Sequence, residues 1–150
     1  MNISIRKAAE QDFEKVFLLI KEFSLFQKTP EKLFITPEQM IQDKDMFQCL
    51  VAVNDDENFV GCASYFFTYY SWSGKGLYLD DLYVQPSFRK QQIGKKLFDA
   101  VIEIARKENC RRMRWLVSGW NKNAIDFYKK IGAVVDSTDM NCELLLHDKN

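Results

Sequence analysis

Residues 77–108 read LYLDDLYVQPSFRKQQIGKKLFDAVIEIARKE and join a strand pattern to a helix pattern through one basic turn. Within 77–84, Leu77, Leu79, Leu82 and Val84 together with Tyr78 and Tyr83 predict a strand, and Pro86 ends it because proline cannot donate to a strand ladder. Apolar residues then recur at spacings of three, four and seven, which predicts a helix that begins near Gln92 and packs one face on a sheet. The residues of that face are Ile93, Leu97, Phe98, Val101, Ile104 and Ala105.

The start of this predicted helix carries an unusual concentration of positive charge. The first turn of a helix has unpaired N–H groups and a partial positive charge, so cations are disfavoured there. A phosphate or pyrophosphate bound between the basic side chains and these N–H groups would offset the repulsion. The alternative is an ordinary solvated polar face. The basic residues are Arg89, Lys90, Lys95 and Lys96.

Length and composition predict one small domain, residues 1–150. The chain has 150 residues and is 47% hydrophobic, which suffices for one core. Its 21 basic residues balance 21 acidic ones, so no overall field favours nucleic acid or a membrane surface, and the local basic cluster favours a small anion. The start, MNISIRKAAEQD, lacks an apolar leader segment. We therefore expect a soluble, cytoplasmic protein that binds neither nucleic acid nor a membrane.

Cysteine and histidine positions argue against a metal site and a disulfide framework. The four cysteines, Cys49, Cys62, Cys110 and Cys142, form no Cys-x-x-Cys pair, and His147 is the single histidine. We expect four reduced thiols, a histidine at the surface and no bound metal. Any catalysis must then use tyrosine, lysine or carboxylate side chains.

The rest of the chain predicts a mixed α/β fold. Residues 77–84, the helix after them and a strand at 113–117 form one βαβ unit. A capping box at Thr36 to Gln39 starts a short helix, and a second short helix is bounded by Asn121 as N-cap and Gly132 as stop. The remaining predicted elements are strands near 3–5, 50–53, 59–70, 134–135 and 142–146, the last two forming a closing hairpin, and a helix near 10–26.

The basic turn resembles the acetyl-CoA signature of the GNAT N-acetyltransferase family. The matching pattern is Val84-x-x-x-x-Arg89-x-x-x-x-Gly94, in which the family's Arg-x-x-Gly-x-Gly wraps the pyrophosphate of coenzyme A. Gln92 stands where family members usually have glycine, and Lys90 stands where many of them do. Each of these glycines lets the backbone approach a phosphate closely.

The short helix after Asn121 resembles the second signature of the same family. Asn121, Ala124, Phe127, Tyr128 and Gly132 match Asn-x-x-Ala-x-x-Phe-Tyr-x-x-x-Gly at every position. Two independent signatures in the right order strengthen the resemblance. It implies a GNAT fold, with a central twisted mixed sheet of six or seven strands flanked by about four helices.

Within this family the chain is most similar to the diamine acetyltransferase branch, which acts on spermidine, spermine or thialysine. The similarity runs from about Ile3 to Ala133 and is carried by IKEF from Ile20, YFFTYYSWSGKGLYLDDLYV from Tyr65 and LVSGWN from Leu116. It implies transfer of the acetyl group of acetyl-CoA to a primary amine of a diamine, polyamine or lysine analogue, by direct attack in a ternary complex. It also implies a homodimer.

The resemblance assigns roles to individual side chains. An alkylamine has a pKa of about 10.4 and must lose a proton before it can attack a thioester. Asp80 occupies the position of a water-linked general base, and Asp81 helps to attract the amine. Neighbours on a regular strand face opposite sides of the sheet, so the two Asp side chains would diverge unless a bulge redirects one of them. Tyr128 matches the general acid, and Trp72 and Glu22 are expected to line the acceptor pocket.

The resemblance also assigns the cofactor contacts. Backbone N–H groups of Leu82 and Val84 are expected to pair with the thioester carbonyl and the pantetheine amides, and Asn121 with the pantetheine. The expected contacts with acetyl-CoA are Leu82, Tyr83, Val84, Arg89, Lys90, Gln91, Gln92, Ile93, Gly94, Lys95, Asn121, Ala124 and Tyr128.

Two other functions remain open at this point. Lys90 and Gln92 in the basic turn suggest a coenzyme A-binding module with weak or no catalysis, and the acceptor could be a protein or another amine. A nucleic-acid or phosphoprotein binder that uses the cluster from Arg89 to Lys96 is a third reading, which the zero net charge argues against.

Overall fold

The computed structural model describes residues 2–146, whose contacts divide into a larger unit up to Trp115 and a smaller unit from Leu116 onward. The strands of the larger unit are β1 (Ser4–Lys7), β2 (Gln48–Val53), β3 (Phe59–Tyr70), β4 (Gly74–Val84) and β5 (Arg112–Arg114). Its helices are α1 (Phe13–Phe26), α2 (Pro37–Gln42) and α3 (Ile93–Lys107), with 3-10 turns η1 (Glu10–Asp12), η2 (Pro30–Lys32) and η3 (Pro86–Phe88). The smaller unit holds α4 (Lys122–Lys130).

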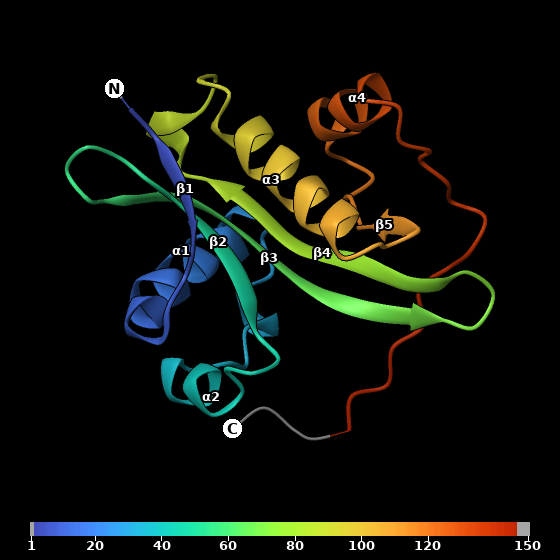
Figure 1. Cartoon of the computed structure of the whole chain (residues 1–150), viewed down its shortest axis with the longest axis horizontal. Helices are drawn as coiled ribbons and strands as arrows, with labels where there is room; N and C mark the ends of the chain where they lie inside the picture. Colours follow the sequence, from blue (N-terminus) through green and yellow to red (C-terminus); the bar gives the residue numbers. More distant parts are fainter. Residues whose placement is uncertain (1, 147–150) are drawn as a thin grey trace. The chain divides into compact units, whose positions relative to one another are not determined.

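The strands form one mixed sheet in the order β1-β2-β3-β4-β5 (Figure 1). All neighbouring pairs are antiparallel except β4 and β5, which are parallel and are connected through α3. Parallel strands need such a crossover, whereas the antiparallel pairs can be joined by short turns. The predicted βαβ unit is therefore confirmed.

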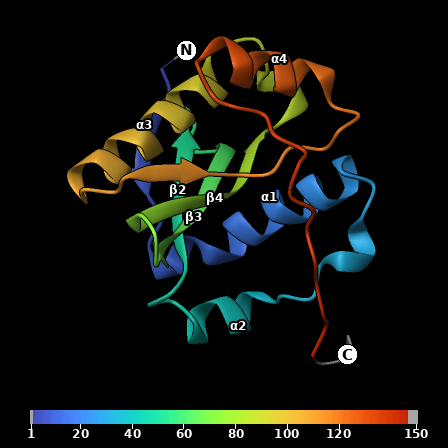
Figure 2. The same cartoon turned by 90° about the vertical axis from the view of Figure 1, so that its right-hand side faces the viewer.

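Helices cover both faces of the sheet in the larger unit, with α3 on one face and α1 and α2 on the other (Figure 2). The predicted apolar face of α3 is buried, and Leu97, Phe98 and Val101 are at most 1% exposed. On the opposite face, α1 buries Phe13 and Val16 against β2 and β3. Burial of one such side chain contributes about 1.5–3 kcal/mol. The two cores hold the sheet from both sides.

Local signals set the ends of two short helices. The Thr36 hydroxyl accepts a hydrogen bond from the Gln39 N–H at 3.1 Å, which caps α2 as predicted, while the Gln39 side chain donates to Asp43 instead of completing the capping box. Asn121 caps α4 by accepting from the Ala124 N–H at 3.3 Å. At the other end Gly132 has φ of +97°, the left-handed conformation that terminates a helix and favours glycine.

The predicted closing hairpin is wrong. Residues 133–146 form no strand, and the strand predicted at 113–117 is shortened to Arg112–Arg114, so the sheet of the described residues has five strands instead of six or seven. Val134 is 90% exposed and Leu144 is 82% exposed. Three leucines in a row give no alternation between a buried and an exposed face, so the pattern specified neither a face nor a partner. The predicted surface position of His147 lies outside the described residues.

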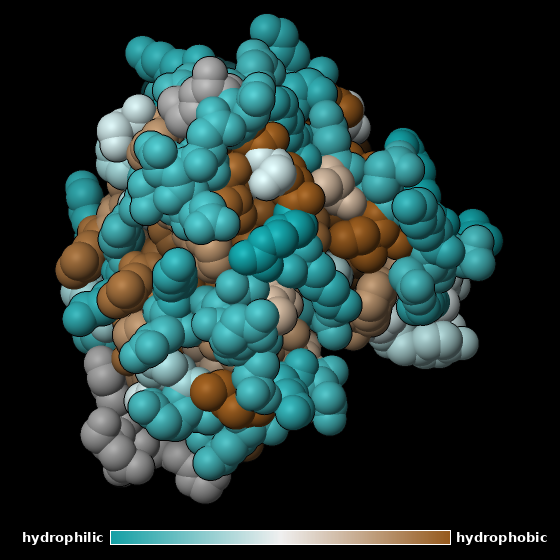
Figure 3. All heavy atoms as spheres, turned by 60° about the vertical axis from the view of Figure 1, so that its left-hand side comes forward, coloured by the Kyte–Doolittle hydropathy of each residue, from teal (hydrophilic) through white to brown (hydrophobic). Residues whose placement is uncertain are grey.

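Some sequence-based expectations concern the chain as a whole. Between residues 2 and 146, no helix is both long and apolar enough to cross a membrane. The four cysteines are free thiols, with Cys49 and Cys62 buried. The described part of the chain contains no cluster of three or more His, Cys, Asp or Glu side chains that could hold a metal ion. On the face drawn in Figure 3, hydrophilic side chains predominate and hydrophobic ones form scattered patches.

Candidate active site

A β-bulge in β4 brings two neighbouring carboxylates to the same side of the sheet. The ladder between β3 and β4 shifts so that Ser64 pairs with Asp81 and Tyr65 pairs with Leu79, which leaves Asp80 as the extra residue. In a regular strand Asp80 and Asp81 would face opposite sides. Here both line one cavity, because the extra residue redirects the local chain.

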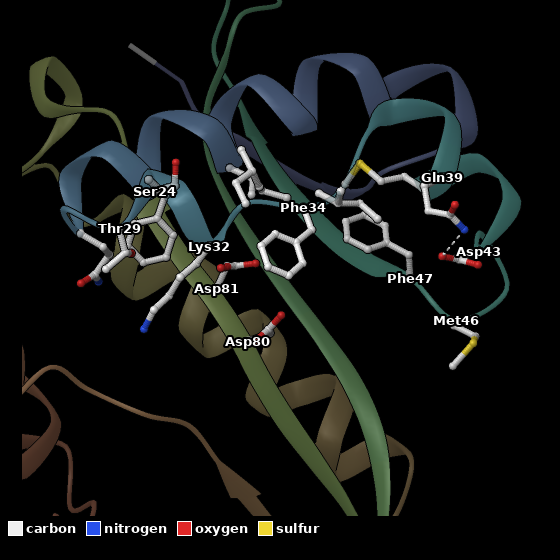
Figure 4. Close-up of a pocket in the computed structure, with 16 residues that line it drawn as sticks. Ser24, Thr29, Lys32, Phe34, Gln39, Asp43, Met46, Phe47, Asp80 and Asp81 are labelled. Carbon is white, nitrogen blue, oxygen red and sulfur yellow. Dashed lines mark hydrogen bonds between the residues drawn. The ribbon is translucent and has the colours of Figure 1, made fainter. Parts of the chain in front are cut away.

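This cavity, which we call the carboxylate pocket, has a volume of about 800 Å³ and lies between β4 and residues 20–47 (Figure 4). Phe23, Phe34 and Phe47 form aromatic walls, with Asp80 and Asp81 reaching in from β4. The other charged residues of the lining are Lys32 and Asp43, the latter bonded to Gln39. Three carboxylates among aromatic walls suit a cation that carries an apolar chain.

Asp81 is the more strongly perturbed of the two β4 carboxylates in the pocket. Its carboxylate is half-buried and accepts a hydrogen bond from the Ser64 hydroxyl, with 2.5 Å between Oγ and Oδ2. Burial, reinforced by the negative charge of Asp80, raises the pKa of Asp81 to about 6, and the Ser64 hydrogen bond opposes this rise. Burial also raises the pKa of Asp80. Carboxylates that titrate closer to neutral pH are better proton acceptors at neutral pH than ordinary ones.

The phosphate loop, residues 85–92, leads from β4 into α3 through two left-handed residues. Lys90 has φ of 64° and Gln92 has φ of 67°. Both are positions where the resembled signature has glycine, and a non-glycine residue in this conformation costs about 1–2 kcal/mol. The loop therefore keeps a backbone path suited to glycine. Gly94 follows, and an added Cβ there would lie 3.7 Å from Val84, an ordinary van der Waals distance.

The basic side chains around the loop differ in how they are held. The Arg89 Nε donates to the Val84 carbonyl at 2.9 Å, and the guanidinium lies over the rings of Phe26 and Tyr83, with 4.6 and 5.7 Å between its carbon and the ring centroids. Lys95 pairs with Asp99 at 2.7 Å. Lys90 and Lys96 are exposed. The N-terminal N–H groups of a 15-residue helix beside these cations fit a phosphate group.

One edge of β4 is open beside this loop. Pairing with β5 covers Gly76 to Tyr78 only, and within residues 2–146 no strand pairs with Leu79 to Val84 on that side. On the other side, Leu82, Tyr83 and Val84 face Ala63, Cys62 and Gly61 of β3. An extended ligand with amide groups can add to an open strand edge through main-chain hydrogen bonds. Along the chain, Leu82 to Val84 of this open edge thus lie between the two carboxylates of the pocket and the phosphate loop.

Glu22 and Trp72 are not brought into the carboxylate pocket. Glu22 faces the end of β4, where it accepts hydrogen bonds from the Tyr83 hydroxyl at 3.2 Å and the Gln85 amide at 3.1 Å. It lines a separate cavity of about 300 Å³. Trp72 lies in the turn between β3 and β4 and is 100% exposed. A helix-face position and a hairpin tip thus point these two side chains elsewhere in the larger unit.

The second signature forms α4 of the smaller unit. Tyr128 is the buried residue of this helix, and burial raises the pKa of its phenol. A phenol with a raised pKa stays protonated at neutral pH and can serve as a proton donor. Asn121 and Ala124 belong to the first turn, where the Asn121 side chain serves as the cap.

Both signatures lie within residues 4–133, the range matched by the model of the Acetyltransferase (GNAT) family. The chain belongs to the GNAT family. As a GNAT protein it is an acetyltransferase, and members of this family use acetyl-CoA as cosubstrate.

Several known proteins are similar to most of the chain. A protein from Sus scrofa named thialysine N-epsilon-acetyltransferase is 34% identical over 143 residues, which cover 88% of this chain and 84% of that protein. Spermidine/spermine N(1)-acetyltransferase-like protein 1 from Homo sapiens is also 34% identical, over 87% of this chain but 20% of its own length. An aminoglycoside acetyltransferase from an uncultured soil metagenomic sample has a TM-score of 0.80 at 20% identity, with 97% of each chain covered, which shows a shared fold.

Several site residues of this GNAT chain were not predicted from the sequence. Ser64 and Gln85 gave no signal, because their roles depend on strand register and on a contact with α1. Phe34 and Phe47 lie in segments of mixed composition and became wall residues only through packing. Phe26 was predicted only as the end of the helix near 10–26, and not as a ring that contacts the Arg89 guanidinium.

Proposed function

We propose that this protein transfers the acetyl group of acetyl-CoA to a primary amine of a small cationic acceptor, a diamine, polyamine or lysine analogue. The observation that carries the proposal is the pair Asp80 and Asp81 in an aromatic pocket of about 800 Å³, four and three residues before Val84, where the same strand ends. The relatives named thialysine N-epsilon-acetyltransferase support this acceptor class.

The pocket residues would bind the acceptor through charge and apolar contact. Asp80 and Asp81 attract the reacting ammonium, and Asp43 lies in the same lining for a second cationic group. Phe34 and Phe47 cover the alkyl chain between the cationic groups. This division suits a molecule with amines at both ends of a flexible chain.

The open edge and the phosphate loop would hold the cosubstrate. Backbone groups of Leu82 and Val84 bind the amides of the pantetheine, and Arg89 with the start of α3 binds the pyrophosphate. Both reactants then contact one strand, which supports direct attack in a ternary complex, because the amine and the thioester are positioned by residues a few positions apart.

Acid and base roles follow the family resemblance. Acetyl-CoA supplies the acetyl group as a thioester. A carboxylate of β4 accepts a proton from the ammonium; the resemblance implies that this is Asp80, acting through water, with Asp81 attracting the cation. Tyr128, whose pKa is raised by burial, donates a proton to the leaving thiolate.

A homodimer is part of this proposal. Aromatic side chains are exposed on the β3–β4 hairpin, where Tyr69 and Trp72 are 82% and 100% exposed. Exposed apolar groups of this kind are typical of association surfaces. Sedimentation equilibrium of the protein and of Trp72→Ser tests it, and an unchanged dimer in the variant would remove the hairpin from the interface.

The proposal is tested by acetyl-CoA-dependent thiol release with spermidine, putrescine, thialysine, lysine and a short peptide. We expect a clear rate with a small diamine or lysine analogue. Tyr128→Phe should lower turnover about 10²- to 10⁴-fold with little change in coenzyme A binding, because only proton donation is lost. Tyr69→Phe is the matched control and should retain the full rate. Tight coenzyme A binding without turnover of any acceptor would favour a binding module instead.

A further inference from the structure

We propose that Ser64 is a positioning residue that holds Asp81 as the proton acceptor of the reaction, and that Asp80 attracts the ammonium. This reverses the division of roles that the family resemblance implies for the two carboxylates. The inference rests on the proposed acetyl transfer and deepens it by assigning the proton to one residue.

The geometry of Ser64 carries the inference. Ser64 is 3% exposed and lies opposite Asp81 in the ladder, so its hydroxyl has few other acceptors to choose from. It donates to Asp81 Oδ2 at 2.5 Å, which fixes the orientation of the carboxylate and leaves Oδ1 for the acceptor amine. Asp80, by contrast, is more exposed than Asp81, and within residues 2–146 no hydrogen bond orients its carboxylate.

The surroundings favour Asp81 over an ordinary carboxylate as the base. Burial and the charge of Asp80 raise its pKa to about 6, so it is mostly ionised at pH 7.5 but holds a proton better than a solvated carboxylate does. The other titratable groups that face it are Lys32 from η2, Asp43 after α2 and the Cys62 thiol on β3. The charges of Lys32 and Asp43 oppose each other, so burial and Asp80 set the direction of the shift.

The proton count closes with these residues. Asp81 Oδ1 takes one proton from the ammonium and releases it to water in the open pocket. The neutral nitrogen forms the N–C bond as the C–S bond breaks, and Tyr128 protonates the leaving sulfur. The nitrogen's second excess proton restores Tyr128 through solvent. Of the two protons that the ammonium loses, one ends on the thiol and one in solvent.

The first test is the pH dependence of kcat/KM for the best acceptor in Ser64→Ala and Ser64→Thr. Because the Ser64 hydrogen bond lowers the pKa of Asp81, its loss should move the midpoint of the acid limb upward by about 0.5–1 pH unit. Ser64→Thr keeps a hydroxyl, so the midpoint of its acid limb should equal that of the wild type. Thr68→Val removes a buried hydroxyl of β3 outside the pocket and should leave the limb in place. An unshifted limb in Ser64→Ala, with thiol release intact, would overturn this inference while the proposed function stands.

The second test compares the two carboxylates directly. Asp81→Asn should lower kcat about 10²-fold or more and abolish the acid limb, whereas Asp80→Asn should mainly raise KM for the amine. The opposite pattern would return the base to Asp80. Carboxyl ¹³C NMR titration of Asp81 in the wild type and in Ser64→Ala gives a readout without turnover, and equal midpoints would also refute the role of Ser64. Absence of acetyl transfer to every amine by the wild type would instead remove the proposed function.

Discussion

The phosphate loop and the carboxylate pocket adjoin the same strand, but their unfavourable energies differ in kind. In the loop the cost is a strained backbone conformation, and in the pocket it is the desolvation and repulsion of carboxylates. Lys90 and Gln92 adopt left-handed conformations without being glycine. Asp81 is partly desolvated next to the charge of Asp80. Backbone strain in the loop can be relieved without removing a chemical group. The electrostatic cost in the pocket cannot be relieved in this way, because the desolvated carboxylate is itself the proposed reactive group.

Asp81→Asn should produce the largest change in stability, an increase that depends on pH. The pKa of Asp81 is raised from 3.8 to about 6 on folding, so ionisation costs the folded state stability above pH 6 and nothing below pH 4. The full interval corresponds to roughly 3 kcal/mol as an upper value. Urea unfolding between pH 4 and 8 should show the variant's advantage growing with pH, accompanied by loss of activity.

Asp12→Asn provides a control with the opposite sign. The Arg6 guanidinium donates to Asp12 at 2.8 Å and holds the pKa of that carboxyl below its usual value. The ionised Asp12 therefore stabilises the protein at pH values above its unfolded pKa of about 3.9. The loss of unfolding free energy in Asp12→Asn, relative to the wild type, should be larger at pH 8 than at low pH. If both variants followed the same pH curve, the difference between the pocket and an ordinary ion pair would disappear.

The sequence predicted the loop far better than the pocket. The strand end at Pro86, the helix start near Gln92 and the cap at Asn121 are local signals, each written within a few residues. The pocket depends on a register shift between β3 and β4 that no local pattern announces, and sequence alternation alone would have separated Asp80 from Asp81. The missing C-terminal strands show the same limit, because apolar content without alternation does not specify a partner.

Gln92→Gly should produce a smaller gain in stability. Glycine removes the steric cost of the left-handed conformation but adds chain entropy to the unfolded state, so the net gain is about 0.5–1 kcal/mol. Glu57→Gly is the matched control, because Glu57 also has positive φ, at 61°, and lies in the turn between β2 and β3. The thermal unfolding temperature should rise in both variants, while the coenzyme A affinity measured by calorimetric titration should change only in Gln92→Gly. Equal coenzyme A affinity in both would mean that the phosphate does not contact this backbone.

Glu22→Gln should have the smallest effect. It tests whether Glu22 acts on the cosubstrate at the phosphate loop or on the acceptor amine. Its carboxylate accepts from Tyr83 and Gln85 at the end of β4, directly before the phosphate loop. Glutamine keeps one acceptor oxygen and loses the charge, so we expect coenzyme A affinity to fall about threefold, roughly 0.6 kcal/mol. Glu14→Gln, an exposed change in the first turn of α1, should leave affinity unaltered. If KM for the amine changed while coenzyme A affinity did not, Glu22 would act on the acceptor, as the family resemblance implies. The hydrogen bonds favour the other outcome, because they join α1 to the residue that begins the loop.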